Sequence, residues 1–248
     1  MPTILVAPRQ VSPDGVVEIV GEDAHHLTRS LRMHPGDTIT VVCSPGKEHL
    51  VRLDAVSSAT VLGRVVSSLV IGREAAARVH LLQAIPKGHG MGEVCERVAE
   101  LGVASVWPVL TERTVPRFDG GQVPLRQVRW QRIARQAAQL AGRHVAPAVN
   151  SVMPLEEAVE STLRLEDPPQ LVACASSATA GIASFPWDPG RPTALVIGPE
   201  GGLTPGELEY LEARGARTVS LGRRNLRTIL AATVAVAVLL SRAGDLEV

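Results

Sequence analysis

The alternation of hydrophobic and polar residues divides the chain near residue 72. Before this point, apolar and polar positions alternate in three runs, at 37–42, 50–56 and 60–66. A period of two predicts strands with one buried face, and short strands separated by glycine and proline turns favour a small β-barrel. The spacing at 23–32 predicts one helix, on which Arg29 and Arg32 share a face. The pattern therefore predicts a β domain over 1–72.

From residue 73 onward, expected strands alternate with expected helices. Short runs rich in apolar residues mark the strands, at 79–85, 103–109, 171–175, 194–197 and 217–221. Helical spacing marks the helices, at 91–101, 125–141, 204–214 and from 228 onward. Because such alternation is typical of a mainly parallel sheet, the pattern predicts an α/β domain over 73–248.

The helix that begins after Thr204 has clear start and stop signals. Thr204 is a good N-cap, and Pro205 suits the first helical position. Glu207 completes a capping box, and Gly215 is well placed to end the helix. These signals fix the helix more firmly than periodicity alone.

The final expected helix is apolar almost all round, and its run Ile229–Leu240 is the longest apolar stretch of the chain. This run is too short to span a bilayer, so no membrane segment is expected. A helix of this kind must be covered on more than one side. We expect a homodimer interface to provide part of that cover.

Composition and charge leave the fold class unchanged. With 248 residues, 45% apolar and 20% charged, the chain can bury a sizeable core. Its formal net charge is zero, so no overall field attracts nucleic acid or a membrane. Only Lys47 and Lys87 of the 25 basic residues are lysines. The many arginines suit phosphate contacts, and the codon bias of a GC-rich genome explains them equally well.

The number and spacing of the cysteines indicate a reducing cellular compartment. Cys43, Cys95 and Cys174 are far apart and odd in number, so no disulfide framework and no metal-ligand spacing is visible. We expect a cytoplasmic protein without a metal site. The first ten residues have no signal-peptide pattern.

Two glycine-containing turns follow expected strands, at 198–202 and 221–228. Such turns can face each other at one end of a sheet, so a small ligand can lie between their backbone amides. Gly201 and Gly202 allow a ligand to approach the backbone closely, and Glu200 can accept a hydrogen bond. The first turn lacks the Lys and Ser/Thr of a phosphate loop, which argues against a triphosphate. An ordinary strand-to-helix turn is the alternative.

Arginines and glycines elsewhere allow two interpretations. Arg223, Arg224 and Arg227 in the second turn can hold a carboxylate or RNA phosphates, or can form solvated surface. The same choice applies to a stripe on the long helix, formed by Arg126, Arg129, Arg132 and Arg135. The segment Gly88–Gly92 precedes a helix but is not GxGxxG, so we expect a flexible turn, with nucleotide binding as the alternative.

Several motifs, in their order and spacing along almost the whole chain, carry a family resemblance. They are His26–Arg32 with Pro35–Asp37, Glu100–Val103, Trp130 with Ile133–Ala134, Gly142–Arg143 with Pro147, Ile197–Gly202, and Leu221–Arg224 with Leu226–Thr228. Together they resemble the bacterial 16S ribosomal RNA uridine-N3 methyltransferases of the SPOUT (trefoil-knot) superfamily.

The resemblance implies an N-terminal PUA-like barrel that grips RNA and a C-terminal domain that threads a trefoil knot. It implies S-adenosylmethionine bound in the knot, between the two glycine turns, in a homodimer. The implied substrate is 16S rRNA of the small ribosomal subunit, methylated on N3 of one uridine near its 3′ end, uridine 1498 in rRNA numbering.

The resemblance also assigns roles to residues. The implied cofactor-binding residues are Ile197, Gly198, Pro199, Glu200, Gly201, Gly202, Ser220, Leu221, Gly222, Asn225, Leu226 and Thr228. The expected RNA-binding residues are Arg29, Arg32, Arg143 and Arg224. Because uridine N3 must lose its proton before it attacks, Arg227 is expected to stabilise the anion and Glu200 to accept the proton.

The chain departs from the family pattern at a few positions. Ile229 and Leu230 stand where the family usually has Glu and Thr, and Gln139–Leu140 replaces a Glu-Gln pair. Arg97 replaces a common lysine. These departures motivate an alternative, a non-catalytic or retargeted RNA-binding paralogue of the family.

Overall fold

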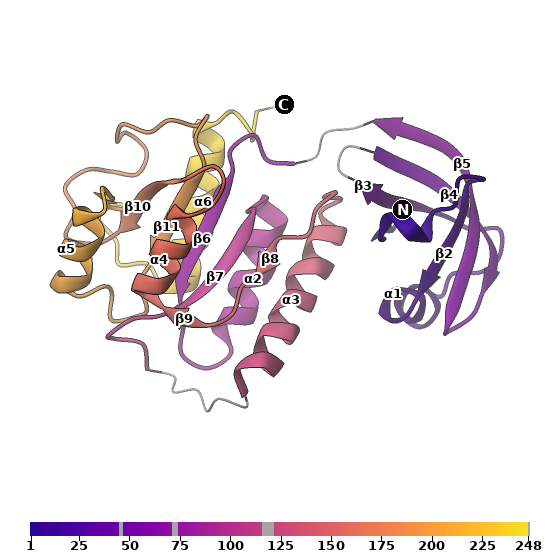
Figure 1. Ribbon diagram of the computed structural model, residues 1–248, viewed down its shortest axis with the longest axis horizontal. Helices are drawn as coiled ribbons and strands as arrows, with labels where there is room; N and C mark the ends of the chain where they lie inside the picture. The colour runs from indigo at the N-terminus through magenta and orange to yellow at the C-terminus, as the bar shows by residue number, and fades with distance from the viewer. Residues whose placement is uncertain (45–46, 71–73, 116–121, 248) are drawn as a thin grey trace. The chain divides into compact units, whose positions relative to one another are not determined.

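The computed structural model describes residues 1–44, 47–70, 74–115 and 122–247, and it shows two compact units (Figure 1). The first unit comprises residues 1–74 together with 138–146. The second comprises residues 75–137 and 147–248. No local pattern in the sequence marks the stretch 138–146 as part of the first unit.

The first unit is built on a five-stranded sheet with the order β1-β3-β4-β5-β2. The strands are β1 Thr3–Leu5, β2 Val16–Val20, β3 Thr38–Ser44, β4 Lys47–Val56 and β5 Thr60–Val70. One face buries Ile19, Val41 and Leu53, each at most 1% exposed. Among the described residues β1 pairs only with β3 and β2 only with β5, so the sheet is open where a closed barrel is predicted.

The helix expected at 23–32 is shorter than predicted. Helix α1, Glu22–His25, continues into a π-helical turn, η2, His26–Ser30. Arg32 has a left-handed backbone, with a φ of 53°, and the N–H of Met33 donates back to the carbonyl of Leu27 at 3.0 Å. The prediction that Arg29 and Arg32 share one helix face is therefore wrong, because the chain closes off the helix between them.

Glu74 joins the stretch 138–146 to the rest of the first unit. Its carboxylate accepts hydrogen bonds from Arg143 Nη2 at 2.7 Å and from the next two backbone N–H groups at 2.8 and 2.9 Å. His144 Nε2 lies 2.8 Å from a carboxylate oxygen of Glu48. Arg143 is 4% exposed, so its guanidinium belongs to a buried ion pair. Such a pair persists only when its remaining hydrogen-bonding groups are also satisfied, as they are around Glu74.

The second unit contains a parallel sheet with the order β12-β10-β11-β6-β7-β8, and β9 pairs with β7. The strands are β6 Val79–Ala84, β7 Ser105–Leu110, β8 Ala148–Val149, β9 Met153–Pro154, β10 Gln170–Cys174, β11 Thr193–Ile197 and β12 Arg217–Val219. The helices are α2 Gly90–Leu101, α3 Gln122–Leu140, α4 Leu155–Leu163, α5 Pro205–Ala213 and α6 Thr228–Arg242. The predicted α/β fold with a mainly parallel sheet is confirmed.

Helices cover both faces of this sheet (Figure 1). Leu81 and Leu195 point toward the layer formed by α2, α3 and α6. Leu82 and Val196, one residue further along, point toward α4 and α5. Because successive side chains of a strand alternate between two buried faces, the central strands read as continuous apolar runs.

The helix signals of the second unit behave as predicted. Thr204 Oγ1 accepts a hydrogen bond from the N–H of Glu207, whose side chain accepts from the N–H of Thr204, so the capping box is formed. Gly102 and Gly215 have φ values of 114° and 83°, which a residue with a side chain adopts only with strain. Gly102 directly follows the end of α2, and Gly215 lies two residues after the end of α5.

Helix α6 is covered on one side within the chain. Ala232, Ala235, Val236 and Leu239 are fully buried, whereas Leu230 remains 43% exposed. No helix among the described residues is long and apolar enough to cross a membrane.

Candidate cofactor site

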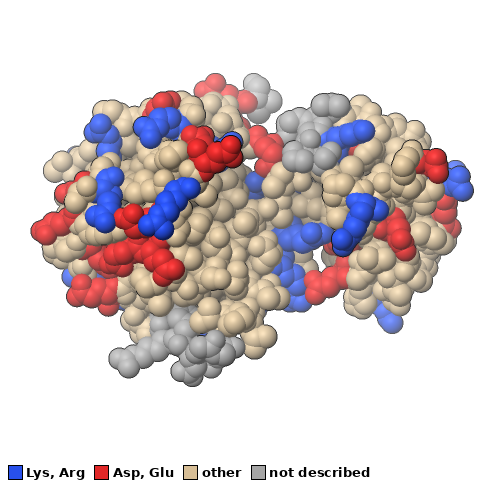
Figure 2. All heavy atoms as spheres, in the orientation of Figure 1, with Lys and Arg blue, Asp and Glu red and all other residues tan. Residues whose placement is uncertain are grey.

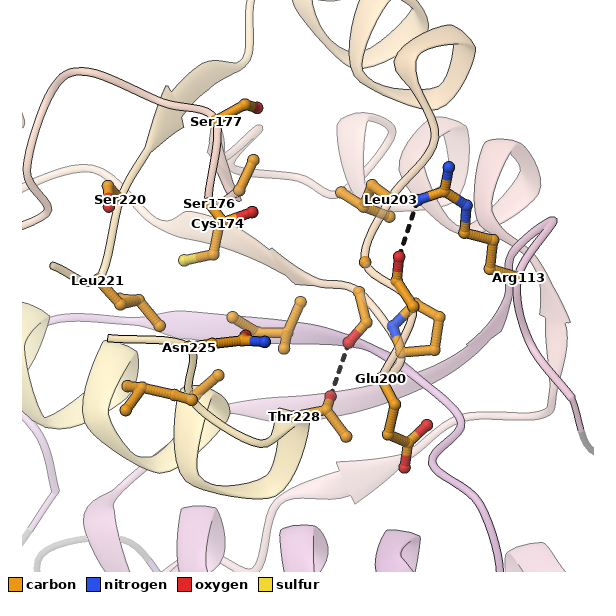
Figure 3. A pocket seen from close by; sticks show the side chains of 18 of the residues that line it. Arg113, Cys174, Ser176, Ser177, Glu200, Leu203, Ser220, Leu221, Asn225 and Thr228 are labelled. Atoms are coloured by element: carbon orange, nitrogen blue, oxygen red, sulfur yellow. Dashed lines mark hydrogen bonds between the residues drawn. The ribbon is translucent and has the colours of Figure 1, made fainter. Parts of the chain in front are cut away.

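A cavity of about 250 Å³ lies where β10, β11 and β12 end and α6 begins (Figure 3). Crevices at the carboxyl ends of parallel strands are where α/β proteins bind ligands. The lining side chains come from the two glycine turns, from the segment after β10 and from the segment after β7. Figure 3 shows Cys174, at the end of β10, and Leu221 and Asn225, from the second glycine turn, pointing toward the same space.

The first glycine turn has no room for larger residues. A Cβ atom at Gly198 would lie 2.9 Å from the N of Leu203 and 3.0 Å from the carbonyl carbon of Gly202. Gly202 has a φ of 69°, and its N–H donates to the carbonyl of Pro199 at 2.9 Å. The turn therefore keeps its backbone next to the cavity only because these positions are glycine.

A buried hydrogen-bond chain ties the first turn to the start of α6. Thr228 Oγ1 donates to the carbonyl of Gly198 at 2.6 Å, and Gln83 Nε2 donates to Thr228 Oγ1 at 3.0 Å. Thr228 is 4% exposed and Gln83 is fully buried. Buried polar contacts of this kind hold a single geometry, since breaking them leaves donors without partners.

The second turn is held from the opposite side. The N–H of Gly222 donates to Ser220 Oγ at 3.2 Å, and Gly222 has a φ of 102°. The segment after β10 crosses the chain at Ser220. The N–H of Ser220 donates to the carbonyl of Ala180 at 2.7 Å, and the N–H of Ile182 donates to the carbonyl of Ser220 at 3.0 Å. Through this crossing, Ser176 and Ser177 also reach the cavity.

Arg113 is a cavity residue that the sequence analysis missed. Its Nη1 donates to the carbonyl of Gly201 at 2.8 Å, so the loop after β7 touches the first glycine turn (Figure 3). The same loop is anchored where the N–H of Glu112 donates to Glu207 Oε1 at 2.8 Å. The position of Arg113, three residues after the buried strand β7, is the signal that identifies it, because parallel strands end at one edge.

The structure brings most of the predicted site residues together. All twelve residues expected to bind the cofactor line the cavity, and so does Arg224. Glu200 Oε1 also accepts the N–H of Lys87 at 3.1 Å. Arg227 is exposed and outside the lining, at the N-cap of α6. The roles of the twelve cavity residues in cofactor binding, and of Glu200 and Arg227 in catalysis, stay predictions.

The predicted RNA-binding arginines lie in several places. Arg29 and Arg32 are exposed in the first unit. Arg143 is engaged by Glu74, so a phosphate would have to displace that carboxylate. For these arginines, contact with RNA stays a prediction.

The chemistry of the lining suits a nucleoside-type ligand. Apolar groups from Ile197, Leu221 and Leu226 lie beside the polar groups of Ser220 and Asn225. Such mixed linings bury a planar ring and orient its polar edges. Burial raises the pKa of the Cys174 thiol to about 12, so this thiol stays protonated and is a poor nucleophile. Among the described residues, no group of three His, Cys, Asp or Glu side chains is placed to hold a metal ion.

The fold and site thus define an α/β protein with a small-molecule crevice between two glycine turns. The RNA methyltransferase domain family matches residues 73–240. A ribosomal RNA small subunit methyltransferase E from Synechocystis is 30% identical, over 94% of this chain and 75% of its own length. One from Bacillus subtilis is 29% identical, over 89% of this chain and 88% of its own length. The chain belongs to the ribosomal RNA small subunit methyltransferase E family of RNA methyltransferases.

Solved structures agree with this assignment. A ribosomal RNA small subunit methyltransferase E from Neisseria gonorrhoeae, bound to S-adenosyl methionine, superposes with a TM-score of 0.87 at 26% identity, covering 98% of both chains. A methyltransferase from Legionella pneumophila in complex with the cofactor SAM gives a TM-score of 0.85 at 30% identity, covering 97% of both chains. The resemblance seen in the sequence is confirmed.

Proposed function

We propose that this protein transfers a methyl group from S-adenosylmethionine to N3 of one uridine, uridine 1498, in 16S ribosomal RNA. The observation that carries the proposal is the cavity between the two glycine turns, whose lining includes every residue that the family resemblance assigns to the cofactor. The relatives' names as small-subunit RNA methyltransferases supply the substrate class.

The residues of the cavity fit the proposed cofactor. The glycine turn at 198–202 leaves backbone atoms uncovered, because any Cβ at Gly198 would collide with the turn itself. Apolar Leu221 and Leu226 are suited to the adenine ring, and Ser220 and Asn225 to its polar edge and the ribose. The cofactor supplies an electrophilic methyl group on a sulfonium centre.

The chain's own residues must prepare uridine for attack. The N3–H of the uracil ring is acidic only weakly, so a proton acceptor and a positive group that favours the anion both speed the reaction. Glu200 is the proposed acceptor, since this residue lines the cavity and its carboxylate is held by the N–H of Lys87. Arg227 is the proposed partner of the uracil anion or of an adjacent phosphate, from its exposed position at the N-cap of α6.

Replacing Arg227 with alanine tests this assignment. We expect kcat to fall roughly a hundredfold, as when one group that stabilises a transition-state anion is removed. Arg223→Ala is the matched control, because Arg223 is exposed in the same turn and does not line the cavity. S-adenosylmethionine affinity, measured by calorimetry, should stay unchanged in both variants. Equal turnover in the two variants would remove Arg227 from the mechanism.

The first unit is the proposed RNA grip. Its five-stranded sheet is open, and Arg29 and Arg32 are exposed beside it, in and just after the π-helical turn η2. Exposed arginines contact phosphates without reading sequence, so they add affinity that falls as salt rises.

We infer that the second unit threads the trefoil knot of the superfamily. The segment 176–187 crosses the end of β12 through Ala180 and Ile182. Arg242, at the far end of α6, donates to the carbonyls of Ile182 and Phe185, each at 2.8 Å. One segment therefore contacts both the end of β12, before α6, and the last residue of α6, which supports threading of the chain at this segment.

The departures from the family pattern favour a second candidate, a non-catalytic RNA-binding paralogue. Ile229 packs against the core, and its Cδ1 would lie 3.0 Å from a Cβ on Gly90, so the position serves packing here. Leu140 is 84% exposed, far from any buried role. Calorimetry separates the candidates, because the enzyme must bind S-adenosylmethionine and a paralogue that has lost the cofactor does not.

The cellular test is nucleoside mass spectrometry of small-subunit RNA from cells with and without the gene. The proposal predicts that 3-methyluridine disappears from 16S RNA when the gene is deleted and returns with a plasmid copy. An unchanged 3-methyluridine level would refute the proposed function.

A further inference from the structure

A second cavity, of about 570 Å³, lies at the opposite end of the parallel sheet from the cofactor site. Gln170, the first residue of β10, and Arg217, the first residue of β12, both line it. The cofactor cavity, in contrast, lies where these strands end. Neither the proposed chemistry nor the family resemblance gives the second cavity a role.

One wall of this cavity is aromatic and firmly held. Trp187 Nε1 donates to Thr193 Oγ1 at 2.9 Å. The guanidinium of Arg242 lies 4.9 Å from the ring centre of Phe185 and 5.1 Å from that of Trp187. Gln170 Nε2 donates to the carbonyl of Asp188 at 2.6 Å and so fixes the chain just after the tryptophan. These contacts set the wall before any ligand arrives, which lowers the entropy lost on binding.

The charge of the cavity is predominantly positive. Arg191, Arg214 and Arg217 line it against one carboxylate, that of Asp188. Arg214 is engaged, because its Nε lies 2.7 Å from Glu160 Oε1. Over the described ranges of the chain, Arg191 and Arg217 have no carboxylate within ion-pair distance. Two exposed guanidinium groups beside a fixed aromatic wall therefore remain available to an anion.

The surrounding surface limits what can approach. Acidic side chains gather over α4 and α5, with basic side chains above them in the same view (Figure 2). Glu156, Glu157 and Glu160 lie on α4. A ligand with its own negative charge is therefore guided to the arginine side of the cavity and away from the acidic helices.

We propose that this cavity binds a nucleotide of single-stranded RNA that flanks the target uridine. Arg191 and Arg217 hold its phosphates, and its base packs against the partly exposed Trp187, which the buried Phe185 and the guanidinium of Arg242 support from within. Arginine with an aromatic wall is the combination that proteins use to bind single strands without reading sequence. The inference rests on the proposed function, because it assumes an RNA substrate.

The spacing between the two cavities suits a short strand of RNA. β10 has five residues, which span about 17 Å at ~3.3 Å per residue. Stacked nucleotides rise about 3.4 Å each, so about five of them cover that length. The cavity therefore holds a nucleotide a few positions from the reacting base and not the reacting base itself.

The test compares Arg191→Ala/Arg217→Ala with Arg164→Ala in the full-length protein. Arg164 is exposed in the same unit but does not line the cavity. The probe is a fluorescent hexauridylate, titrated at several salt concentrations and read by anisotropy. We expect the double variant to bind at least about tenfold more weakly and with a salt slope smaller by about 1.4, since two phosphate contacts with a single strand are lost. The control should stay within about twofold of the wild type.

Three further readouts sharpen the test. Unchanged S-adenosylmethionine affinity in calorimetry shows that the double variant is folded, and Trp187→Leu should weaken hexauridylate binding through loss of the wall. Hexauridylate binding by the double variant that equals the control overturns the proposal. Uridine monophosphate that binds the wild type as tightly as hexauridylate also overturns it, because the site would then serve a free nucleotide.

The outcome is separable from that of the proposed function. A wild type that makes 3-methyluridine while the double variant binds hexauridylate normally refutes the second site alone. A wild type that makes no 3-methyluridine while the double variant loses hexauridylate binding refutes the proposed function and leaves the site standing.

Discussion

Single residues at the cofactor site act through their backbone as much as through side chains. The two turns were predictable because glycine at 198, 201, 202 and 222 is visible in the sequence, and a family resemblance assigned the residues between them. Arg113 follows a buried strand, a signal that the sequence analysis did not use. Ser176 and Ser177 were not predictable, because they lie in a loop without periodicity and reach the cavity only through the tertiary fold. Residue patterns thus identify turns better than the loops that complete a site.

Gly198→Ala tests how strictly the first turn depends on glycine. The added Cβ would lie 2.9 Å from a backbone nitrogen that cannot move freely, so we expect at least about a tenfold loss of S-adenosylmethionine affinity. Gly206→Ala is the control, because a Cβ there meets nothing within 4 Å and Gly206 lies in the first turn of α5. Alanine at 206 should stabilise the protein by about 0.5 kcal/mol. Calorimetry and thermal unfolding measure both effects, and equal cofactor affinity in the two variants would contradict the account.

The thiol of Cys174 offers a test of the cavity's polarity. Its raised pKa of about 12 means that the neutral thiol is favoured, so the reactive thiolate is scarce at pH 8 and increases as pH rises toward 12. We expect iodoacetamide at pH 8 to modify Cys174 at least about tenfold more slowly in the folded protein than in urea, where the pKa is about 8.5. Peptide mass spectrometry gives the rate for this cysteine. Equal rates in the two states would show that the site is not as apolar as described.

At the scale of helices and strands, local signals predicted the helices whose ends are marked by capping residues or glycines. The capping box at Thr204 and the glycines after α2 and α5 marked real helix ends. Helix α4, Leu155–Leu163, and the two-residue strands β8 and β9 were missed. Strands β8 and β9 are too short for a period to emerge, and their conformation depends on pairing with β7. Helix α4 buries Leu155, Ala158, Val159 and Thr162, so its helical spacing was present in the sequence and was overlooked.

Glu207 links two elements, so its loss should be felt beyond its own helix. Its carboxylate accepts the N–H of Thr204 at 2.7 Å and that of Glu112 at 2.8 Å, and the residue is 8% exposed. Glu207→Ala leaves two donors without partners, and we expect a loss of about 2 kcal/mol or more in the free energy of unfolding. The exposed Glu209 lies on the same helix, so Glu209→Ala should change stability by less than about 0.5 kcal/mol. Urea unfolding with a constant m-value compares them, and similar midpoints would contradict the linking role.

At the scale of the whole molecule, the sequence predicted two domains. It did not predict that residues 138–146, from within the second domain's sequence, belong to the first unit. The stretch 138–146 packs with the first unit through Glu74, a contact between residues about seventy positions apart. No local pattern encodes such a pairing, since it depends on which surfaces meet after folding. Helix α6 was expected to be covered on more than one side. Its inner side is buried within the chain, and Leu230 is 43% exposed.

Exposed apolar residues support a homodimer of the second unit. On α3, Leu125 and Val128 are 74% and 69% exposed and lie three residues apart, so a partner that covers this face of α3 buries both. We predict a sedimentation mass of 52.4 kDa, twice the 26.2 kDa of one chain. Leu125→Glu/Val128→Glu should shift the protein toward monomer, whereas Leu69→Glu, at a 60% exposed site in the first unit, should not. A wild type that sediments as a monomer at micromolar concentration would refute the dimer.

The central claim is that the glycine-turn cavity presents a methyl donor to a uridine of small-subunit RNA. Its most direct test incubates purified protein and S-adenosylmethionine with small ribosomal subunits from a strain that lacks this methylation, and measures 3-methyluridine in the RNA by mass spectrometry. The account predicts 3-methyluridine at one position with the wild type and its loss with Gly198→Ala. Small subunits that gain no 3-methyluridine from a protein that binds S-adenosylmethionine would contradict it.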